Sequence, residues 1–166
     1  WHAGQSFWGK DKSLNKKSIG IEISNPGHQY GYKNFNKKQI YSLIKLSKKL
    51  IKKYSIKNKY ILGHSDIAPL RKKDPGEKFP WKFLAKKNIG VWHKLKSNEC
   101  KKNRNKKISE DEMVFFNKLK KFGYKIEGLD KKGRKKLIKN FQRRFRPELV
   151  NGKIDLECFE ILKSLI

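Results

Sequence analysis

Acidic residues, cysteine and long apolar runs are all scarce in this sequence. Its 166 residues hold 15 Asp and Glu against 43 Lys and Arg, so the formal net charge is +28. No stretch approaches the ~18 consecutive apolar residues of a membrane-spanning helix. No secretory leader is visible, and the chain opens at Trp1 inside what looks like a folded pattern. We therefore interpret the N-terminus as truncated.

Only two cysteines are present, Cys100 and Cys158. They are too few and too far apart for a CxxC metal site or a disulfide scaffold. Two interpretations stay open at this point. The thiols are free and partly buried, or they form a single bridge that ties a linker to the last helix in an oxidising compartment.

The lysines are spread along the whole chain among Asn and Ile, with no Arg-rich arm and no nucleic-acid-binding signature. This bias has two explanations: solvated faces shaped by the base composition of the coding DNA, or selection for an acidic partner such as peptidoglycan and its anionic companion polymers. We expect no specific nucleic-acid partner. A basic nucleic-acid-binding protein remains a competing class, which salt-sensitive, sequence-dependent DNA binding would favour. Aromatic residues make up 12% of the chain, which predicts a folded core.

The first half of the chain predicts alternating strands and helices. Residues 18–24 alternate three isoleucines with Gly20, Glu22 and Ser24, which is typical of a strand. An apolar stripe at helical spacing predicts a helix over 37–54, capped by Asn36. Residues 60–63 are predicted to form a short buried strand that ends at His64. A proline-containing loop over 65–80 and a short helix over 81–87 follow.

The composition changes after about residue 96. Residues 97–108 are polar and basic, and we interpret them as a linker. Ser109 and Glu112 form a capping-box pattern for a helix that ends near Phe122. A second helix is predicted over 131–145, and Asp155 is predicted to cap a third that reaches Ile166. This tail is small for independent stability, so we expect it to dock on the first part of the chain.

The densest group of chemically capable side chains lies in residues 63–76, where His64, Asp66, Lys72 and Asp74 occur together. Imidazole nitrogen and carboxylate oxygen are ordinary zinc ligands, and a catalytic zinc site uses three protein ligands plus water. A His at the end of a strand and an Asp ten residues later can converge on one ion. This spacing by itself is a weak signal, because such pairs are usually unrelated.

Several further segments accompany this group in a fixed order. They are Trp1-His-Ala-Gly4, Ser6-Phe-Trp8, Ser18-Ile-Gly-Ile-Glu22, Gly63-His-Ser-Asp-Ile-Ala-Pro69, Arg71-Lys-Lys-Asp-Pro-Gly76 and Phe79-Pro-Trp81. Over residues 1–92 the sequence thereby resembles the zinc-dependent N-acetylmuramoyl-L-alanine amidases of type 2, in their periplasmic lipoprotein-like branch. The resemblance implies an α/β fold in which helices flank a mixed central sheet, here without its N-terminal strand.

The resemblance also implies roles for individual residues. His64 and Asp74 match the second and third zinc ligands, Glu22 matches the acidic residue that activates water, and Lys72 matches the basic residue that stabilises the oxyanion. The family's first ligand is a His on a strand before the Trp-His-Ala-Gly motif, where this chain has no residue. His2 and Trp1 lie in that motif, which implies contact with the substrate.

The expected function is therefore zinc-dependent hydrolysis of the amide between N-acetylmuramic acid and L-alanine, in peptidoglycan or its fragments. The competing expectation is a catalytically impaired peptidoglycan-binding protein, because one zinc ligand is missing. Phe141-Gln-Arg-Arg-Phe145 and Asn151-Gly-Lys-Ile-Asp155 make the tail resemble a three-helix peptidoglycan-binding module, although a generic packing appendage is the alternative. We expect an amidase domain (1–96), a basic linker (97–108) and a binding domain (109–166), in a monomeric protein of the periplasm.

Overall fold

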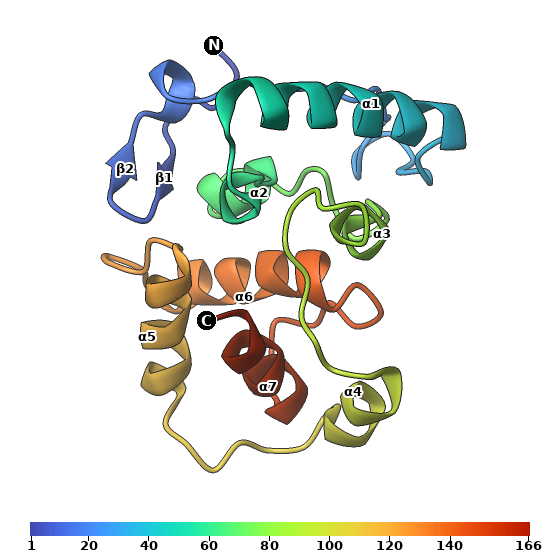
Figure 1. The fold of residues 1–166 in the computed structure, drawn as a ribbon. Coiled ribbons are helices and arrows are strands. Elements are labelled where there is room, and N and C mark those ends of the chain that lie inside the picture. The colour runs from blue at the N-terminus through green and yellow to red at the C-terminus, as the bar shows by residue number, and fades with distance from the viewer.

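The computed structural model describes residues 1–166, and helices dominate it (Figure 1). The helices are α1 (Lys37–Tyr54), α2 (His64–Ile67), α3 (Trp81–Ala85), α4 (Ser97–Asn103), α5 (Glu112–Phe122), α6 (Lys131–Phe145) and α7 (Leu156–Leu165). Two 3₁₀ turns cover Leu14–Lys16 and Asn58–Tyr60. Strands β1 (Phe7–Trp8) and β2 (Asp11–Lys12) form a small antiparallel hairpin.

The predicted mixed central sheet is not found within these residues, where β1 and β2 are the only paired strands. Residues 18–24 form no strand, and Ile19 and Ile21 are exposed. Alternation along a segment shows which side chains share a face, but a strand also needs a partner for its backbone groups. The predicted strand over 60–63 is also wrong, since a 3₁₀ turn ends at Tyr60 and His64 begins helix α2.

Helix α1 has the predicted bounds and the predicted cap. The Asn36 side chain accepts a hydrogen bond from the backbone N–H of Lys38, and the Gln39 side chain accepts one from the backbone N–H of Asn36. Such reciprocal caps satisfy donors that the first helical turn leaves free. The helix buries Ile40 and Leu43 and turns its lysines outward. The short helix predicted over 81–87 is confirmed as α3.

The interpretation of residues 97–108 as a linker is wrong in its first half, because Ser97–Asn103 form helix α4. Cys100 on this helix is buried, and Arg104 directly after it donates to both carboxylate oxygens of Glu157 on α7, at 2.7 and 2.8 Å. These contacts come from residues more than fifty positions away, so local composition gave no sign of them. The helix is therefore stabilised by tertiary packing.

Helices α5, α6 and α7 lie where three helices are predicted in the tail. The cap of α5 differs from the prediction, because Asp111, not Ser109, accepts the hydrogen bond from the N–H of Met113. The second helix has its predicted bounds. Asp155 caps α7 as predicted, by accepting from the backbone N–H of Cys158 at 2.9 Å.

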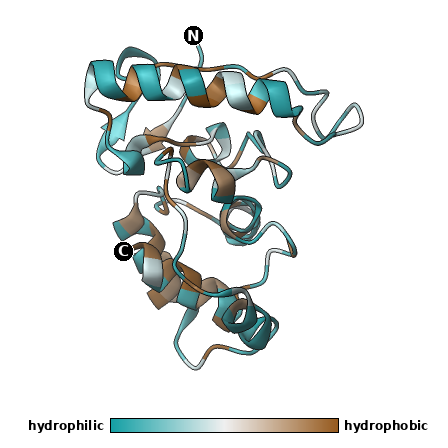
Figure 2. Ribbon diagram, turned by 45° about the vertical axis from the view of Figure 1, so that its right-hand side comes forward, coloured by the Kyte–Doolittle hydropathy of each residue, from teal (hydrophilic) through white to brown (hydrophobic).

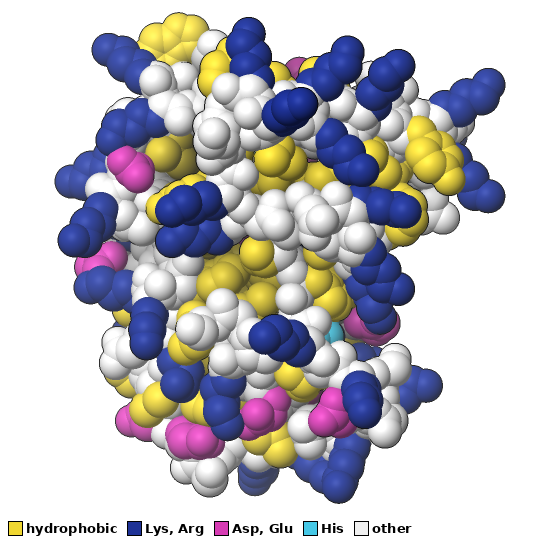
Figure 3. All heavy atoms as spheres, viewed as in Figure 1, with side chains coloured by type: hydrophobic (Ala, Val, Ile, Leu, Met, Phe, Trp, Pro, Cys, Tyr) yellow, Lys and Arg dark blue, Asp and Glu magenta, His cyan; other side chains and the backbone are white.

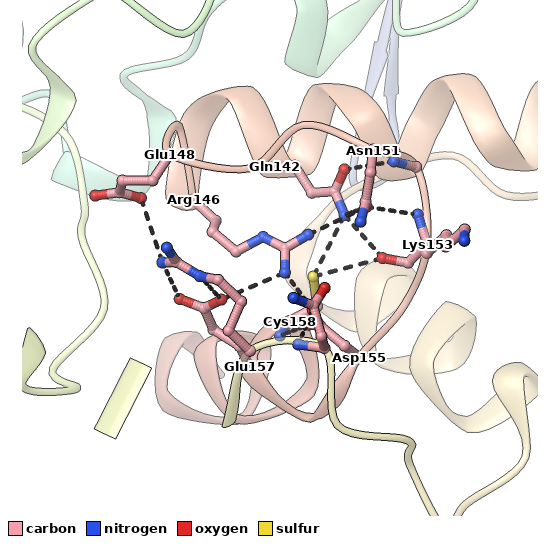
Figure 4. Close-up of polar contacts among 11 residues, drawn as sticks. Gln142, Arg146, Glu148, Asn151, Lys153, Asp155, Glu157 and Cys158 are labelled. Carbon is pink, nitrogen blue, oxygen red and sulfur yellow. Dashed lines mark hydrogen bonds and ion pairs between the residues drawn. The ribbon is translucent and has the colours of Figure 1, made fainter. Parts of the chain in front are cut away.

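The turn between α6 and α7 is fixed by buried charges (Figure 4). Arg146 donates to Asp155 and lies 3.3 Å from Glu157, and all three residues are buried. Gln142 accepts from the N–H of Gly152 and donates to the carbonyl of Lys153, each at 2.8 Å. Burial of charge is tolerated here because each charged group has partners.

The main hydrophobic core joins the two ends of the chain. Ala3, Trp8 and Leu14 pack with the apolar faces of α5, α6 and α7. The Trp8 ring meets Tyr124 edge-on, with centroids 5.0 Å apart. The tail therefore docks on the first part of the chain, as expected. In Figure 2 the brown, hydrophobic residues gather among the helices near the C-terminus, whereas α1 alternates brown and teal.

A second, smaller core lies beneath α1. There Ile40 and Leu43 pack with Phe79, Trp81 and neighbouring apolar side chains. On the surface, Lys and Arg side chains are scattered over the whole face seen in Figure 3, between white polar and yellow hydrophobic areas. None of the helices combines the length and the apolar character that crossing a membrane requires.

Candidate active site

One loop carries both predicted metal ligands, and its backbone closes on itself. Helix α2 begins at His64, and the N–H of Ser65 donates to the carbonyl of Asp74 at 2.9 Å. The N–H groups of Arg71 and Lys72 both donate to the carbonyl of Ala68. These bonds bring residues that are ten apart in sequence to the same place.

His64 and Asp74 are in direct contact. The Nδ1 atom of His64 lies 3.0 Å from Oδ2 of Asp74, and its Nε2 atom lies 3.3 Å from the carbonyl oxygen of Ala3. Partial burial raises the pKa of Asp74, but the hydrogen bond and charge of His64, with the charge of Lys72, outweigh it and hold that pKa below its ordinary value. An ionised carboxylate and an imidazole that lie side by side can both serve as ligands of one cation.

The amino-terminal segment is held against this loop by Arg71. Its guanidinium donates to the carbonyl of Ala3 at 2.6 Å and to that of Gln5 at 3.0 Å. The backbone N–H groups of His2, Ala3 and Gly4 donate to the side chain of Asn15. The position of the segment relative to His64 is therefore set by several bonds.

The other predicted site residues are not joined to the His64–Asp74 pair by a hydrogen bond. His2 lies 2.8 Å from the hydroxyl of Ser18 and against Gly20, whose missing side chain leaves room for the imidazole. It thus stands beside the extended segment that carries Glu22. Glu22 is exposed and makes no hydrogen bond, and Trp1 is fully exposed.

The residues present supply two metal donors, not three. Imidazole nitrogen and carboxylate oxygen suit zinc, and the closeness of His64 and Asp74 lets both face one ion. No group of three or more His, Cys, Asp and Glu residues gathers in a way that would hold a metal ion. Cys100 and Cys158 are free, buried thiols and lie outside this group.

Comparison with known proteins decides the family. The model of the N-acetylmuramoyl-L-alanine amidase family matches residues 1–77. A solved structure of the Escherichia coli amidase AmiD, in complex with anhydro-N-acetylmuramic acid-L-Ala-D-gamma-Glu-L-Lys, aligns with a TM-score of 0.87 at 36% identity. That alignment covers 99% of this chain and 67% of the AmiD chain in that structure. The chain belongs to the N-acetylmuramoyl-L-alanine amidase family.

Other members of the amidase family match to different extents. The sequence of E. coli AmiD is 37% identical over the whole of this chain, which spans 63% of AmiD's length. The amidase AmpD of Haemophilus influenzae is 42% identical over 49% of this chain and 42% of its own. The structure of AMPDH3 from Pseudomonas aeruginosa aligns with a TM-score of 0.87 at 33% identity, over 99% of this chain and 67% of its own.

The sequence pattern did not predict the buried contacts that support the loop carrying His64 and Asp74 in this amidase-family chain. Asp66 is 1% exposed and accepts hydrogen bonds from the N–H of Gly63, the hydroxyl of Tyr124 and the guanidinium of Arg144. Burial, and then the charge of Asp66, raise the pKa of Tyr124 well above its ordinary value, so its hydroxyl remains a donor. A signal was available, because Arg144 falls at helical spacing within the apolar stripe of α6.

Proposed function

We propose that this protein hydrolyses the amide bond between N-acetylmuramic acid and L-alanine, in peptidoglycan or its soluble fragments. The observation that carries the proposal is the His64–Asp74 contact at 3.0 Å, in a chain 37% identical along its full length to an amidase. His64 and Asp74 would hold zinc. When bound, zinc supplies Lewis-acid polarisation of the carbonyl and lowers the pKa of water.

The remaining chemistry falls to side chains of this chain. Amide hydrolysis needs a base that takes a proton from the attacking water and an acid that protonates the leaving amine of L-alanine. Glu22 suits both steps, since its carboxylate is exposed and has no partner that would compete for the proton. Lys72 lies two residues from Asp74 in the same loop and its charge favours the ionised form of Asp74, so we assign it the stabilisation of the oxyanion.

Substrate contacts are assigned to the amino-terminal segment and the tail. His2 borders the segment that carries Glu22, and Trp1 next to it in sequence offers a free aromatic face to a sugar or peptide. Helices α5, α6 and α7 would contribute affinity for the peptidoglycan strand. We infer from a substrate of this kind a location in the cell envelope, with the periplasm as the proposed compartment.

A second candidate is a muropeptide-binding protein with little catalytic power. Two protein ligands in place of three favour it, because zinc would be held weakly. Zinc titration of the metal-free 166-residue chain separates the two candidates, with His64→Ala as the matched control.

The enzyme proposal expects about one zinc per chain, lost in the His64→Ala variant, together with release of peptides from muropeptides that a chelator abolishes and zinc restores. Absence of saturable zinc binding, with muropeptide binding retained, supports the second candidate. Hydrolysis that persists in metal-free protein, as checked by elemental analysis, would contradict the proposed mechanism.

A further inference from the structure

The loop that carries His64 and Asp74 rests on one face of helix α6. Lys136, Asn140, Arg143 and Arg144 are spaced along α6 so that they share a face. Each contacts a different point of residues 66–77: Lys136 the carbonyl of Leu70, Asn140 two carbonyls, Arg143 the carboxylate of Glu77 and Arg144 that of Asp66. A helix of the tail therefore forms the floor of the proposed active site.

Asn140 is the central contact of this floor. Its amide nitrogen donates to the carbonyl of Pro69 at 2.8 Å and to that of Lys72 at 3.0 Å, and its oxygen accepts from Arg143 at 2.8 Å. The side chain is 2% exposed, so water cannot replace these bonds. The two carbonyls bracket the turn that lies between His64 and Asp74.

We propose that Asn140 is a positioning residue, which sets the geometry of the His64–Asp74 pair and of Lys72 by clamping residues 69–72 from below. The proposal rests on the proposed function for the meaning of that geometry. The clamp itself is a property of the folded chain. Its only route to the site is through the backbone, because no hydrogen bond joins Asn140 to His64 or Asp74.

Helix α6 also supplies a matched control, two positions after Asn140. Gln142 is also a buried amide on α6, but it donates to Lys153 and Asn151 within the tail and makes no hydrogen bond to the loop. Asn140→Asp and Gln142→Glu each exchange a buried amide for a carboxylate of the same size. Both lose donors, but only the first leaves the carbonyls of Pro69 and Lys72 without partners.

The experiment compares the full chain with both variants by amide hydrogen exchange and by the NMR resonances of the His64 imidazole. The amides of Ser65, Arg71 and Lys72 are the loop reporters, since each donates to a carbonyl of the loop. We expect Asn140→Asp to speed their exchange by at least about tenfold and to shift the His64 resonances. Gln142→Glu should leave both unchanged while speeding exchange of the amide of Lys153 in the tail, whose acceptor Asn151 loses its bond from Gln142.

The design separates local from global effects. If Asn140→Asp does not fold, Asn140→Ser, which introduces no charge, is measured in its place. Unchanged loop exchange and unchanged His64 resonances in the folded Asn140 variant would overturn the proposal, as would equal changes in Gln142→Glu. These readouts require neither zinc nor turnover, so a chain that proved not to hydrolyse muropeptides would refute the proposed function without affecting this test.

Discussion

Two carboxylates in the same loop differ in role because their surroundings differ. Asp66 is buried and accepts hydrogen bonds from Gly63, Tyr124 and Arg144. Its carboxylate is therefore not accessible to a metal or a substrate. The Asp74 side chain is 58% exposed, and its one partner in a side-chain hydrogen bond is His64. The first therefore belongs to the framework, and the second is free to act as a ligand.

At the residue scale, replacement of Glu22 by alanine tests its proposed role as acid and base. We expect turnover of a soluble muropeptide to fall by at least about 100-fold, because general acid–base groups typically contribute 10²–10⁴-fold. Zinc content should stay near normal. Glu160→Ala, which removes a half-buried carboxylate on α7 that pairs with Lys163, is the control and should retain turnover. Loss of zinc together with turnover would identify Glu22 as a ligand or a structural residue.

The thiol of Cys158 should be nearly inert. Burial raises its pKa to about 12, so the reactive thiolate is roughly one part in 10⁴ at pH 8. Alkylation of the native protein should therefore be slow at Cys158 and rapid once the chain is denatured, as followed by peptide mass spectrometry. A Cys100–Cys158 bridge in oxidising buffer, or fast native labelling, would contradict the two free buried thiols.

At the scale of elements, the predictions that held rest on local signals. Helices over 37–54 and 131–145 follow from apolar spacing, and the first also from its cap Asn36, all of which act within a few residues. The predictions that failed depend on contacts with distant residues. Residues 18–24 alternate but pair with no strand, and α4 is held by contacts such as that of Arg104 with Glu157. Likewise, the sequence pattern predicted that His64 and Asp74 lie close together, but it could not show that α6 supports their loop.

The cap of α7 should make the tail sensitive to acid. Partial burial raises the pKa of Asp155, but bonds from the N–H groups of Cys158 and Asn105, with the charge of Arg146, lower it below its ordinary value. A carboxyl group with a lowered folded-state pKa stabilises the fold above its unfolded-state pKa of about 3.9. That contribution is lost as the pH falls through the folded-state value.

Asp155→Asn keeps a capping oxygen and removes the charge that faces Arg146. The free energy of unfolding at pH 7 should fall by about 1.5–3 kcal/mol, as for a buried charged hydrogen bond, and the difference from the parent should shrink below pH 4. Urea unfolding at several pH values measures it. Asp130→Asn, at an exposed cap of α6, is the control and should cost less than about 1 kcal/mol. A pH-independent deficit at position 155 would assign the effect to packing.

At the scale of the whole molecule, the tail and the first part of the chain share one hydrophobic core. Trp8 lies between Phe122 and Tyr124, and the N–H of Gly9 donates to the carbonyl of Gly123 at 2.8 Å. The pair of Asp66 and Arg144 joins the same two parts through a buried contact. The sequence predicted an amidase domain, a linker and a binding domain that docks on the first, but it did not indicate which residues of the two parts would pack together.

Deletion of residues 99–166 tests whether the first part of the chain depends on this shared core. The deletion strips Trp8, Leu14 and Ala3 of the apolar partners they have in the main core and leaves Asp66 buried without its arginine, or newly exposed. We expect residues 1–98 to lose cooperative thermal unfolding and near-ultraviolet circular dichroism, and to bind a hydrophobic dye. Mixing the two separately produced fragments should restore a cooperative transition, because the shared core can form between them. A fragment 1–98 that unfolds cooperatively by itself, and loses only its affinity for insoluble peptidoglycan, would show that the tail is a separable binding module and that the shared core contributes little to stability.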